Sequence, residues 1–275
     1  MLGLLLLQVL ACCLWLGHSE GVTSFASCPD FFYERTTPNY VLQPDNPAWI
    51  CQRYSNSYRY ATLYDRDRRI PIYSAYIYRP GSHKQPHTWS FVEPQLMGEN
   101  SFEEMERESV LTNQYNFTVD QIKRSQAVLD DYENMTGLDR GQLCPSGHQY
   151  STEGKTATFT LTNSVPQDSC LYKGQWYTYE SQNMSNFSKN CTITYVITGA
   201  VPGNSYVADG RVNRPSHIWS AACCVVDTHT RKAWGAIAEN DEENLEILSL
   251  GQLEDRLTRL YKKNVTLFKN ACRQE

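Results

Sequence analysis

The sequence lacks the motifs that identify the commonest enzyme classes. It contains no G-x-S-x-G serine motif, no Walker A loop, no glycine-rich dinucleotide motif and no H-E-x-x-H zinc motif. Positive charge is also scarce, since 25 Lys and Arg stand against 30 Asp and Glu and give a net charge of −5. These absences exclude the usual serine hydrolases, kinases and zinc proteases. They also argue against a broadly basic nucleic-acid surface, although a local basic groove stays open.

Long apolar runs are missing except at the N-terminus. Residues 1–17 form an uncharged apolar run, and the small residues Gly17 and Ser19 match the pattern of a signal-peptidase site. This pattern predicts a signal peptide over residues 1–19 and a single domain over residues 20–275, with an uncleaved membrane anchor as the alternative. Because no later stop-transfer or lipid-anchor signal occurs, the mature chain is predicted to be secreted, extracellular and free of the membrane.

Ten cysteines are present, and eight of them follow the predicted signal peptide. An even number in a secreted chain predicts disulfide bonds, and Cys28 and Cys51 are expected to hold an N-terminal arm. No pair has C-x-x-C spacing, so a zinc site is not expected. The neighbours Cys223 and Cys224 should have different partners, because a ring between adjacent residues is strained. Six Asn-x-Ser/Thr sequons predict glycosylation, at Asn116, Asn134, Asn183, Asn186, Asn190 and Asn264.

Hydrophobic patterns predict an α+β fold. Residues 60–64 and 70–78 flank a charged turn at residues 65–69, which predicts a β-hairpin with a solvated turn, or alternatively a phosphate-binding loop. The other predicted strands cover residues 156–161, 192–200, 218–226 and 233–238, and the predicted helices cover residues 118–135 and 171–187 and a segment with Leu253, Leu257 and Leu260. No repeat or linker is visible, so one domain with a mixed or antiparallel central sheet and flanking helices is expected.

Two stretches contain groups suited to phosphodiester chemistry. Residues 138–145 read LDRGQLCP and residues 160–167 read TLTNSVPQ, followed by Trp176 and Glu180. Together they resemble the DNA/RNA non-specific endonuclease family, whose ββα-metal finger carries Asp-Arg-Gly-His, Asn-x-x-Pro-Gln, a later metal-binding Asn and a Trp. The resemblance extends over about residues 28–272 and includes TYVITGAVPG and RPSHIWSAACC. It implies a disulfide-stabilised nuclease fold and Mg²⁺-assisted hydrolysis with a histidine as general base.

Two positions depart from the family pattern. The general-base position holds Gln142, whose neutral amide cannot take up a proton near pH 7. The metal position, nine residues after Asn163, holds Tyr172, a phenol that is a poor Mg²⁺ ligand. Met184 stands where such nucleases often have an arginine. The family residues that are retained are Asp139, Arg140, Gly141, Asn163, Pro166, Gln167, Trp176 and Glu180.

The finger also contains two cysteines, one in each half. Cys144 follows the Asp-Arg-Gly turn and Cys170 precedes the helix with Tyr172. We expect them to bond to each other and to hold the finger without an ion, with free thiols or other partners as the alternatives.

These departures predict a secreted glycoprotein whose nuclease site is weak or inactive and which acts by binding. The loss of a general base alone costs about 10²- to 10⁴-fold in rate. Weak affinity for DNA or RNA through Arg140 and residues 66–69 is expected. One alternative is an active Mg²⁺-dependent DNase/RNase in which His148, otherwise a loop histidine, acts as base and Asp168 or Gln167 holds the metal. The other is an extracellular immune interaction protein that binds no nucleic acid. Mg²⁺ is expected only if the protein is active, and the sequence specifies neither the extracellular partner nor the oligomeric state.

Overall fold

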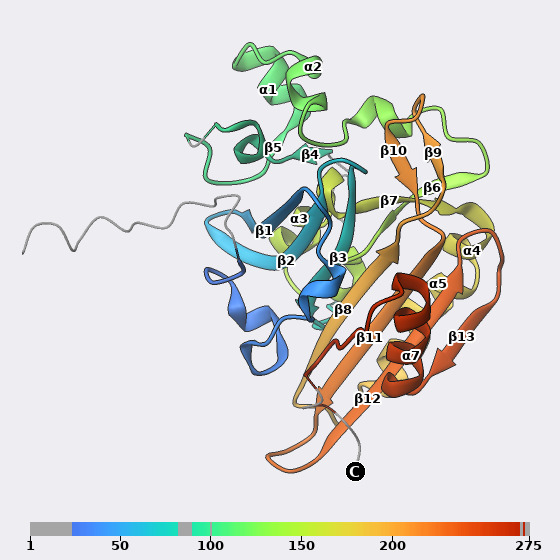
Figure 1. The fold of residues 1–275 in the computed structure, drawn as a ribbon. Helices are drawn as coiled ribbons and strands as arrows, with labels where there is room; N and C mark the ends of the chain where they lie inside the picture. The colour runs from blue at the N-terminus through green and yellow to red at the C-terminus, as the bar shows by residue number, and fades with distance from the viewer. Residues whose placement is uncertain (1–23, 82–89, 100, 270–271, 273–275) are drawn as a thin grey trace, which may run out of the picture.

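A computed structural model describes residues 24–81, 90–99, 101–269 and 272, so the predicted signal peptide lies outside the described residues. A central antiparallel sheet runs through the molecule (Figure 1). Its strand order is β1 (Pro47–Tyr54), β2 (Ser57–Asp65), β3 (Ile70–Ile77), β8 (Ile193–Val201), β11 (His217–Val225), β12 (Arg231–Glu239) and β13 (Leu245–Leu248). The predicted fold class is confirmed, as are the predicted hairpin and the strands at 192–200, 218–226 and 233–238.

Shorter elements surround this sheet. Three two-stranded pairs are β4 (Phe91–Val92) with β5 (Glu106–Arg107), β6 (Leu138–Gln142) with β7 (Ser164–Asp168), and β9 (Ser205–Val207) with β10 (Val212–Arg214). The α-helices are α1 (Glu108–Gln114), α2 (Val119–Lys123), α3 (Thr152–Ala157), α4 (Ser169–Lys173), α5 (Gln175–Thr178), α6 (Met184–Phe187) and α7 (Leu250–Tyr261). The 3₁₀ turns are η1 (Pro29–Phe31), η2 (Tyr33–Arg35), η3 (Tyr40–Leu42), η4 (Pro94–Met97), η5 (Leu129–Tyr132), η6 (Ser146–His148) and η7 (Leu161–Asn163), and η8 (Tyr179–Asn183) is a π-helical turn.

The central sheet is buried on both faces. The N-terminal arm and α7 cover one face, where Phe32, Leu253 and Leu257 pack against the sheet (Figure 1). The helices that follow β7 cover the other face, where Trp234 and Tyr179 are buried together. Because successive side chains of a strand point to opposite faces, the middle strands are apolar along nearly their whole length, and this explains why the sequence marks β8, β11 and β12 so clearly.

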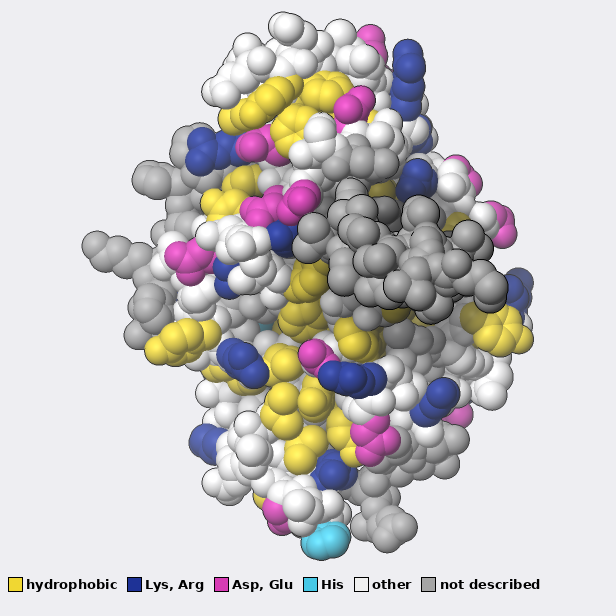
Figure 2. All heavy atoms as spheres, turned by 90° about the vertical axis from the view of Figure 1, so that its left-hand side faces the viewer, with side chains coloured by type: hydrophobic (Ala, Val, Ile, Leu, Met, Phe, Trp, Pro, Cys, Tyr) yellow, Lys and Arg dark blue, Asp and Glu magenta, His cyan; other side chains and the backbone are white. Residues whose placement is uncertain are grey.

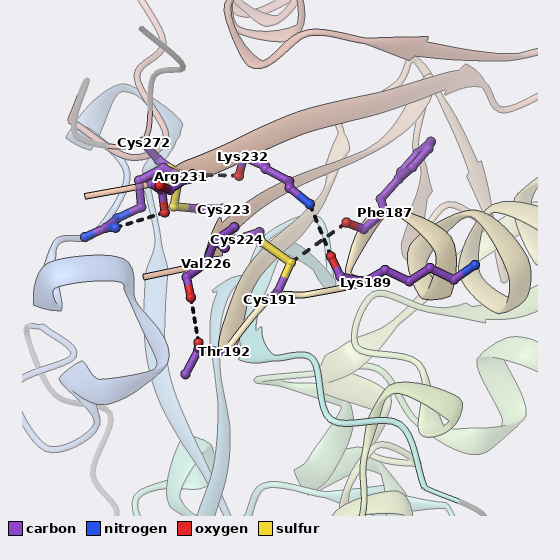
Figure 3. Close-up of a disulfide and its surroundings, with 11 residues drawn as sticks. Phe187, Lys189, Cys191, Thr192, Cys223, Cys224, Val226, Arg231, Lys232 and Cys272 are labelled. Carbon is purple, nitrogen blue, oxygen red and sulfur yellow. Dashed lines mark hydrogen bonds between the residues drawn. A yellow bond between two sulfur atoms is a disulfide. The ribbon is translucent and has the colours of Figure 1, made fainter. Parts of the chain in front are cut away.

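The same alternation separates the two neighbouring cysteines of β11. Cys223 faces the side of α7 and bonds to Cys272, whereas Cys224 faces the opposite side and bonds to Cys191 (Figure 3). The expectation of different partners is therefore confirmed. A third bond, Cys28–Cys51, fastens the N-terminal arm to β1.

The face at the left of Figure 1 mixes apolar and charged side chains. Apolar side chains form a band down its middle, and Lys and Arg lie among Asp and Glu beside that band (Figure 2). This face therefore presents no uniformly basic area, in keeping with the negative net charge. No helix among the described residues is both long and apolar enough to cross a membrane.

Two predicted elements are wrong. Residues 156–161 are not a strand, because Ser151 caps a helix by accepting a hydrogen bond from the Gly154 backbone, and α3 then extends through Ala157. The helix predicted over 118–135 starts at its expected cap, Thr118, but α2 ends at Lys123. The guanidinium of Arg211 donates to the Lys123 carbonyl at 3.3 Å. This carbonyl therefore does not accept the hydrogen bond of a continuing helix.

The helical stretch predicted over 171–187 is present in pieces. It divides into α4, α5, the π-helical turn η8 and α6, with the first break at Gly174. A Cβ at Gly174 would lie 2.6 Å from the Cys170 carbonyl oxygen, so glycine is required for this close turn.

The predicted bond between Cys144 and Cys170 is wrong. Cys144 is buried among aromatic residues, and its sulfur accepts a hydrogen bond from the Gln149 amide at 3.3 Å. Cys170 is exposed in the first turn of α4, which Asp168 caps by accepting from the Cys170 backbone at 2.9 Å. One side chain is thus buried and the other exposed, and both are free thiols.

Thiol labelling should distinguish these two cysteines. Under native conditions an alkylating reagent is expected to modify Cys170 and to leave Cys144 intact, because burial blocks access and raises the pKa of the Cys144 thiol. Peptide mapping by mass spectrometry, before and after unfolding without reductant, measures this. Equal labelling of both cysteines in the native protein, or of neither after unfolding, would contradict the assignment.

Candidate functional site

The finger consists of β6 and β7 followed by α4. The two strands pair antiparallel, with Asp139 opposite Gln167 and Gly141 opposite Val165. A Cβ on Gly141 would lie 2.1 Å from the Gln167 side-chain oxygen, so glycine leaves room for this buried side chain. The second strand begins at Ser164, directly after Asn163, and not in the 156–161 segment that the hydrophobic pattern favoured.

Asn163 joins the finger to the central sheet. Its side chain is fully buried and its amide donates to the carbonyls of Cys144 at 3.0 Å and Thr158 at 2.9 Å. Its oxygen accepts from the Cys144 backbone and the Ser74 hydroxyl, both at 2.9 Å. All hydrogen-bonding groups of this side chain are therefore occupied by the fold.

A pocket of about 510 Å³ opens beside the finger and brings together four of the predicted site residues, namely Gln142, His148, Tyr172 and Glu180. The other predicted residues lie around it. Arg140 donates to the Ser90 hydroxyl at 2.9 Å, and Asp139 forms a 2.8 Å ion pair with Lys173, which lowers the pKa of Asp139.

Gln142 is held in one orientation at the end of β6. Its amide nitrogen donates to the Thr158 carbonyl at 2.8 Å, and its oxygen accepts from the Ser146 backbone at 3.4 Å. A carboxamide has no titratable proton in the neutral range. Gln142 therefore contributes fixed dipoles and no proton acceptor.

His148 is buried in η6, where the sequence suggested a loop. Its Nε2 lies 2.9 Å from the Glu180 carbonyl, which can only accept, so Nε2 carries the proton. Its Nδ1 then accepts from the Tyr76 hydroxyl at 3.0 Å. Burial lowers the pKa of His148 to about 4. The ring is therefore neutral near pH 7, with both nitrogens occupied.

Glu180 and Trp176 lie on one face of the helical segment, as their four-residue spacing predicted. The indole nitrogen of Trp176 donates to the Glu180 carboxyl at 2.8 Å. Burial raises the pKa of Glu180 to about 8, so this carboxyl is protonated at neutral pH. The pKa of the nearby Tyr172 phenol is also raised, first by burial and then by Glu180 and Asp139.

These groups do not suit a magnesium ion. Mg²⁺ prefers ionised carboxylate and amide oxygens. Among its described lining residues the pocket offers a phenol at Tyr172, a carboxamide at Gln142 that is already hydrogen bonded, and one carboxyl, Glu180, that accepts from the Trp176 indole. Of the substitute ligands, Asp168 uses one carboxylate oxygen to cap α4, and Gln167 is buried in β7 next to Gly141. Within the described residues, the one cluster of three potential ligands is the exposed set Glu239, Asp241 and Glu242.

Glu180 should make the folded state less stable as the pH rises from 7 to 8. The folded protein retains a proton that the unfolded chain, with a Glu180 pKa near 4.5, has released, so the stabilisation present at low pH is lost toward pH 8. The slope is at most about 1.4 kcal/mol per pH unit. His148 acts in the opposite direction, but between about pH 4 and 6.5, and Glu93 titrates by about pH 7.

Thermal unfolding of the wild type and of Glu180→Gln measures this effect. The glutamine keeps an acceptor for Trp176, and its unfolding temperature should change less between pH 7 and 8 than that of the wild type. The same pH slope in both proteins would contradict the raised pKa.

Sequence reasoning missed the aromatic lining of the pocket. Tyr78 at the end of β3 and Tyr177 in α5 join Tyr172, with Pro80 and Pro145 beside them. The ring of Tyr78 meets that of His148 edge-on, with 4.7 Å between centroids. Tyr177 is 60% exposed although its neighbour Trp176 is buried, and the sequence alone does not distinguish the two.

Comparison with known proteins agrees with this geometry. The family model described as DNA/RNA non-specific endonuclease matches residues 37–268. The chain is 33% identical over 92% of its length to the human protein named endonuclease domain-containing 1 protein, and 30% identical over 90% to the mouse protein of that name. It spans about half of these relatives, 49% and 48% of their lengths.

A solved structure shows the same fold. A chain in the crystal structure of the EndoG/EndoGI complex, described as revealing the mechanism of EndoG inhibition, superposes with a TM-score of 0.53 at 16% identity. The superposition covers 79% of this chain and 86% of that one. The family is generally metal-dependent. The family match over most of the chain shows that this protein belongs to the DNA/RNA non-specific endonuclease family.

Proposed function

We propose that this protein is a secreted glycoprotein that binds nucleic acid through a nuclease fold and cleaves it weakly or not at all. The observation that carries the proposal is the state of the finger pocket. Gln142 stands at the base position with its amide bonded to Thr158, Tyr172 stands at the metal position, and Glu180 is protonated at neutral pH. The pocket has no ionised carboxylate and no free imidazole among its described residues.

The rate enhancement that is lost without a general base and a metal ion supports this proposal. A positioned general base contributes about 10²- to 10⁴-fold, which is about 2.7 to 5.5 kcal/mol of barrier. A bound metal ion contributes several kcal/mol more by stabilising the leaving oxygen. Both contributions act on one step, so either loss leaves little activity.

The alternative of an active enzyme that uses His148 as its base has little support. Water activation needs a free imidazole nitrogen within hydrogen-bond reach of the water. Here Nδ1 is used by Tyr76 and Nε2 by the Glu180 carbonyl, and the low pKa makes the ring a weak base. Binding without cleavage therefore agrees better with the state of His148 than catalysis by this residue does.

Tyr172 and Tyr177 suit the pocket to unpaired bases. Stacking of a base on an exposed aromatic ring contributes about 1–3 kcal/mol and depends little on base identity. The half-buried Arg140 in β6 of the finger adds positive charge near a phosphate backbone. We therefore expect single-stranded DNA or RNA to bind better than duplex DNA, in which the bases are stacked with one another.

Secretion and glycosylation fit the covalent features of the chain. Three disulfides are typical of proteins that fold in an oxidising compartment. Five of the six sequon asparagines are exposed, and Asn183 is half-buried in η8. Mass spectrometry of the protein secreted by cells, with and without glycosidase treatment, tests which sequons carry glycans.

The test combines cleavage and binding with the purified protein. Supercoiled plasmid and single-stranded RNA are incubated with Mg²⁺ or with a chelator, and binding of a single-stranded oligonucleotide is measured over a range of salt concentrations. We expect no chelator-sensitive cutting, and binding that weakens with salt. Robust cutting that His148→Ala abolishes would establish the active-enzyme alternative. A salt slope near zero, or no binding, would favour a partner other than nucleic acid.

Replacement of Tyr177 tests the stacking surface. Tyr177→Ala should weaken single-strand binding about 5- to 150-fold, because one stacking contact of about 1–3 kcal/mol is removed. Tyr206→Ala is the matched control, since Tyr206 is 45% exposed on β9 and outside the pocket. Equal affinities of the two variants would contradict the assignment of the pocket.

A further inference from the structure

A second pocket lies at the turn between β2 and β3. Its volume is about 490 Å³, and it shares no lining residue with the finger pocket. Three arginines contribute to its wall: Arg66 and Arg69 from the turn, and Arg124 from the end of α2. Segments far apart in the sequence thus bring three guanidinium groups to one cavity.

The turn is folded so that its arginines divide into two groups. The buried carboxylate of Asp65 accepts from the backbone of Asp67 at 2.9 Å and from the side chain of Arg68 at 2.9 Å. Arg68 is therefore neutralised by Asp65 on its own side of the turn. Arg69 adopts a left-handed backbone conformation with φ of 55° and leaves the turn in another direction, into the wall of the pocket.

The three pocket arginines lack carboxylate partners among the described residues. No ion pair within 4.0 Å involves Arg66, Arg69 or Arg124. Arg69 donates only to backbone carbonyls, the nearest being that of Asp67 at 3.1 Å. The pocket also contains Asp67, whose carboxylate accepts from the Asn46 amide at 2.8 Å, and Glu99. Three arginines and two acidic residues thus line the pocket, and its net charge is positive.

One buried donor in this pocket has no acceptor. The Nε of Arg66 is shielded from solvent, and no hydrogen-bond partner for it is present among the described residues. Leaving a buried donor of a charged group unsatisfied destabilises the protein, so the Arg66 guanidinium favours a negatively charged neighbour. An anion in the pocket would balance the charge of all three arginines.

We propose that this pocket binds a phosphate-type oxyanion. Guanidinium groups present paired N–H donors in a planar fork that matches two oxygens of a tetrahedral anion. Inorganic phosphate and the monophosphate group of a nucleotide share this chemistry, and both fit a cavity of this size. The site acts independently of the finger, so it does not depend on the proposed function of that pocket.

Calorimetric titration with inorganic phosphate, thymidine 5′-monophosphate and thymidine tests the proposal at constant ionic strength. We expect saturable binding of the two phosphates and none of thymidine. Tighter binding of the monophosphate would identify a nucleotide as the ligand, and equal binding would identify the free anion. The absence of saturable phosphate binding in the wild type would overturn the proposal.

Variants locate the binding to this pocket. Arg66→Gln and Arg124→Gln should each weaken phosphate binding at least tenfold. Arg256→Gln is the charge-matched control, because Arg256 forms a surface ion pair with Glu246 away from the pocket. Arg124 is exposed, so its variant should keep the fold, which thermal unfolding verifies. Undiminished affinity in folded Arg124→Gln and Arg66→Gln would overturn the assignment.

Discussion

The double variant Gln142→His with Tyr172→Asn is expected to gain Mg²⁺-dependent cleavage of plasmid DNA. The exchange supplies a titratable imidazole at the end of β6 and an amide oxygen at the metal position. Because a general base alone contributes about 10²- to 10⁴-fold, we expect the nicking rate to rise at least about 100-fold above that of the wild type. Gel densitometry of supercoiled, nicked and linear plasmid with Mg²⁺ measures it.

The single variants are the controls for this gain. Each restores one part of a unit whose members act on the same step, so each should gain far less than the double variant. Addition of a chelator should return the double variant to the wild-type rate. A double variant that folds, as judged by its unfolding temperature, and still fails to cut would mean that the pocket has been remodelled beyond these two residues. Met184, buried at the start of α6, is the next position to change.

Asn163→Ala is expected to destabilise the protein by about 3–5 kcal/mol. The change removes the hydrogen bonds that the buried amide makes to Cys144, Thr158 and Ser74, and each buried group that loses its partner costs about 1–3 kcal/mol. For a chain of this size the unfolding temperature should fall by about 10 °C. Differential scanning calorimetry measures the shift.

Asn113→Ala is the matched control, because Asn113 is an exposed residue of α1 and its change should cost less than about 0.5 kcal/mol. A comparable loss in both variants would show that the effect is not specific to the buried amide. A loss below about 1 kcal/mol in Asn163→Ala would mean that water replaces the amide in its cavity. The expected result assigns Asn163 to holding the finger against the sheet.

The sheet could be predicted from the sequence because its signal is local. Strands buried on both faces read as continuous apolar runs, and β8 and β11 lie within one or two residues of their predicted bounds. The helix at 118–135 failed because its end depends on Arg211, about 90 residues later, whose guanidinium takes the Lys123 carbonyl. No residue pattern within 118–135 indicates the contact between Arg211 and the Lys123 carbonyl.

The candidate site, too, could be predicted only in part. Order and spacing were enough to bring Gln142, Tyr172 and Glu180 to one pocket. The state of His148 could not be predicted, because its neutrality depends on Tyr76 from β3 and on a carbonyl of the π-helical turn η8. The false bond between Cys144 and Cys170 arose for a related reason, since the burial of Cys144 depends on residues distant in the sequence.

The two disulfides that meet on β11 have a consequence for resistance to proteolysis. They close adjoining loops, Cys191 to Cys224 and Cys223 to Cys272, with sequence separations of 33 and 49 residues. A protease that severs any one peptide bond between Cys191 and Cys272 therefore leaves both fragments covalently attached. Such a nicked molecule keeps its full mass until the disulfides are reduced, and its last third stays anchored to the middle of the sheet.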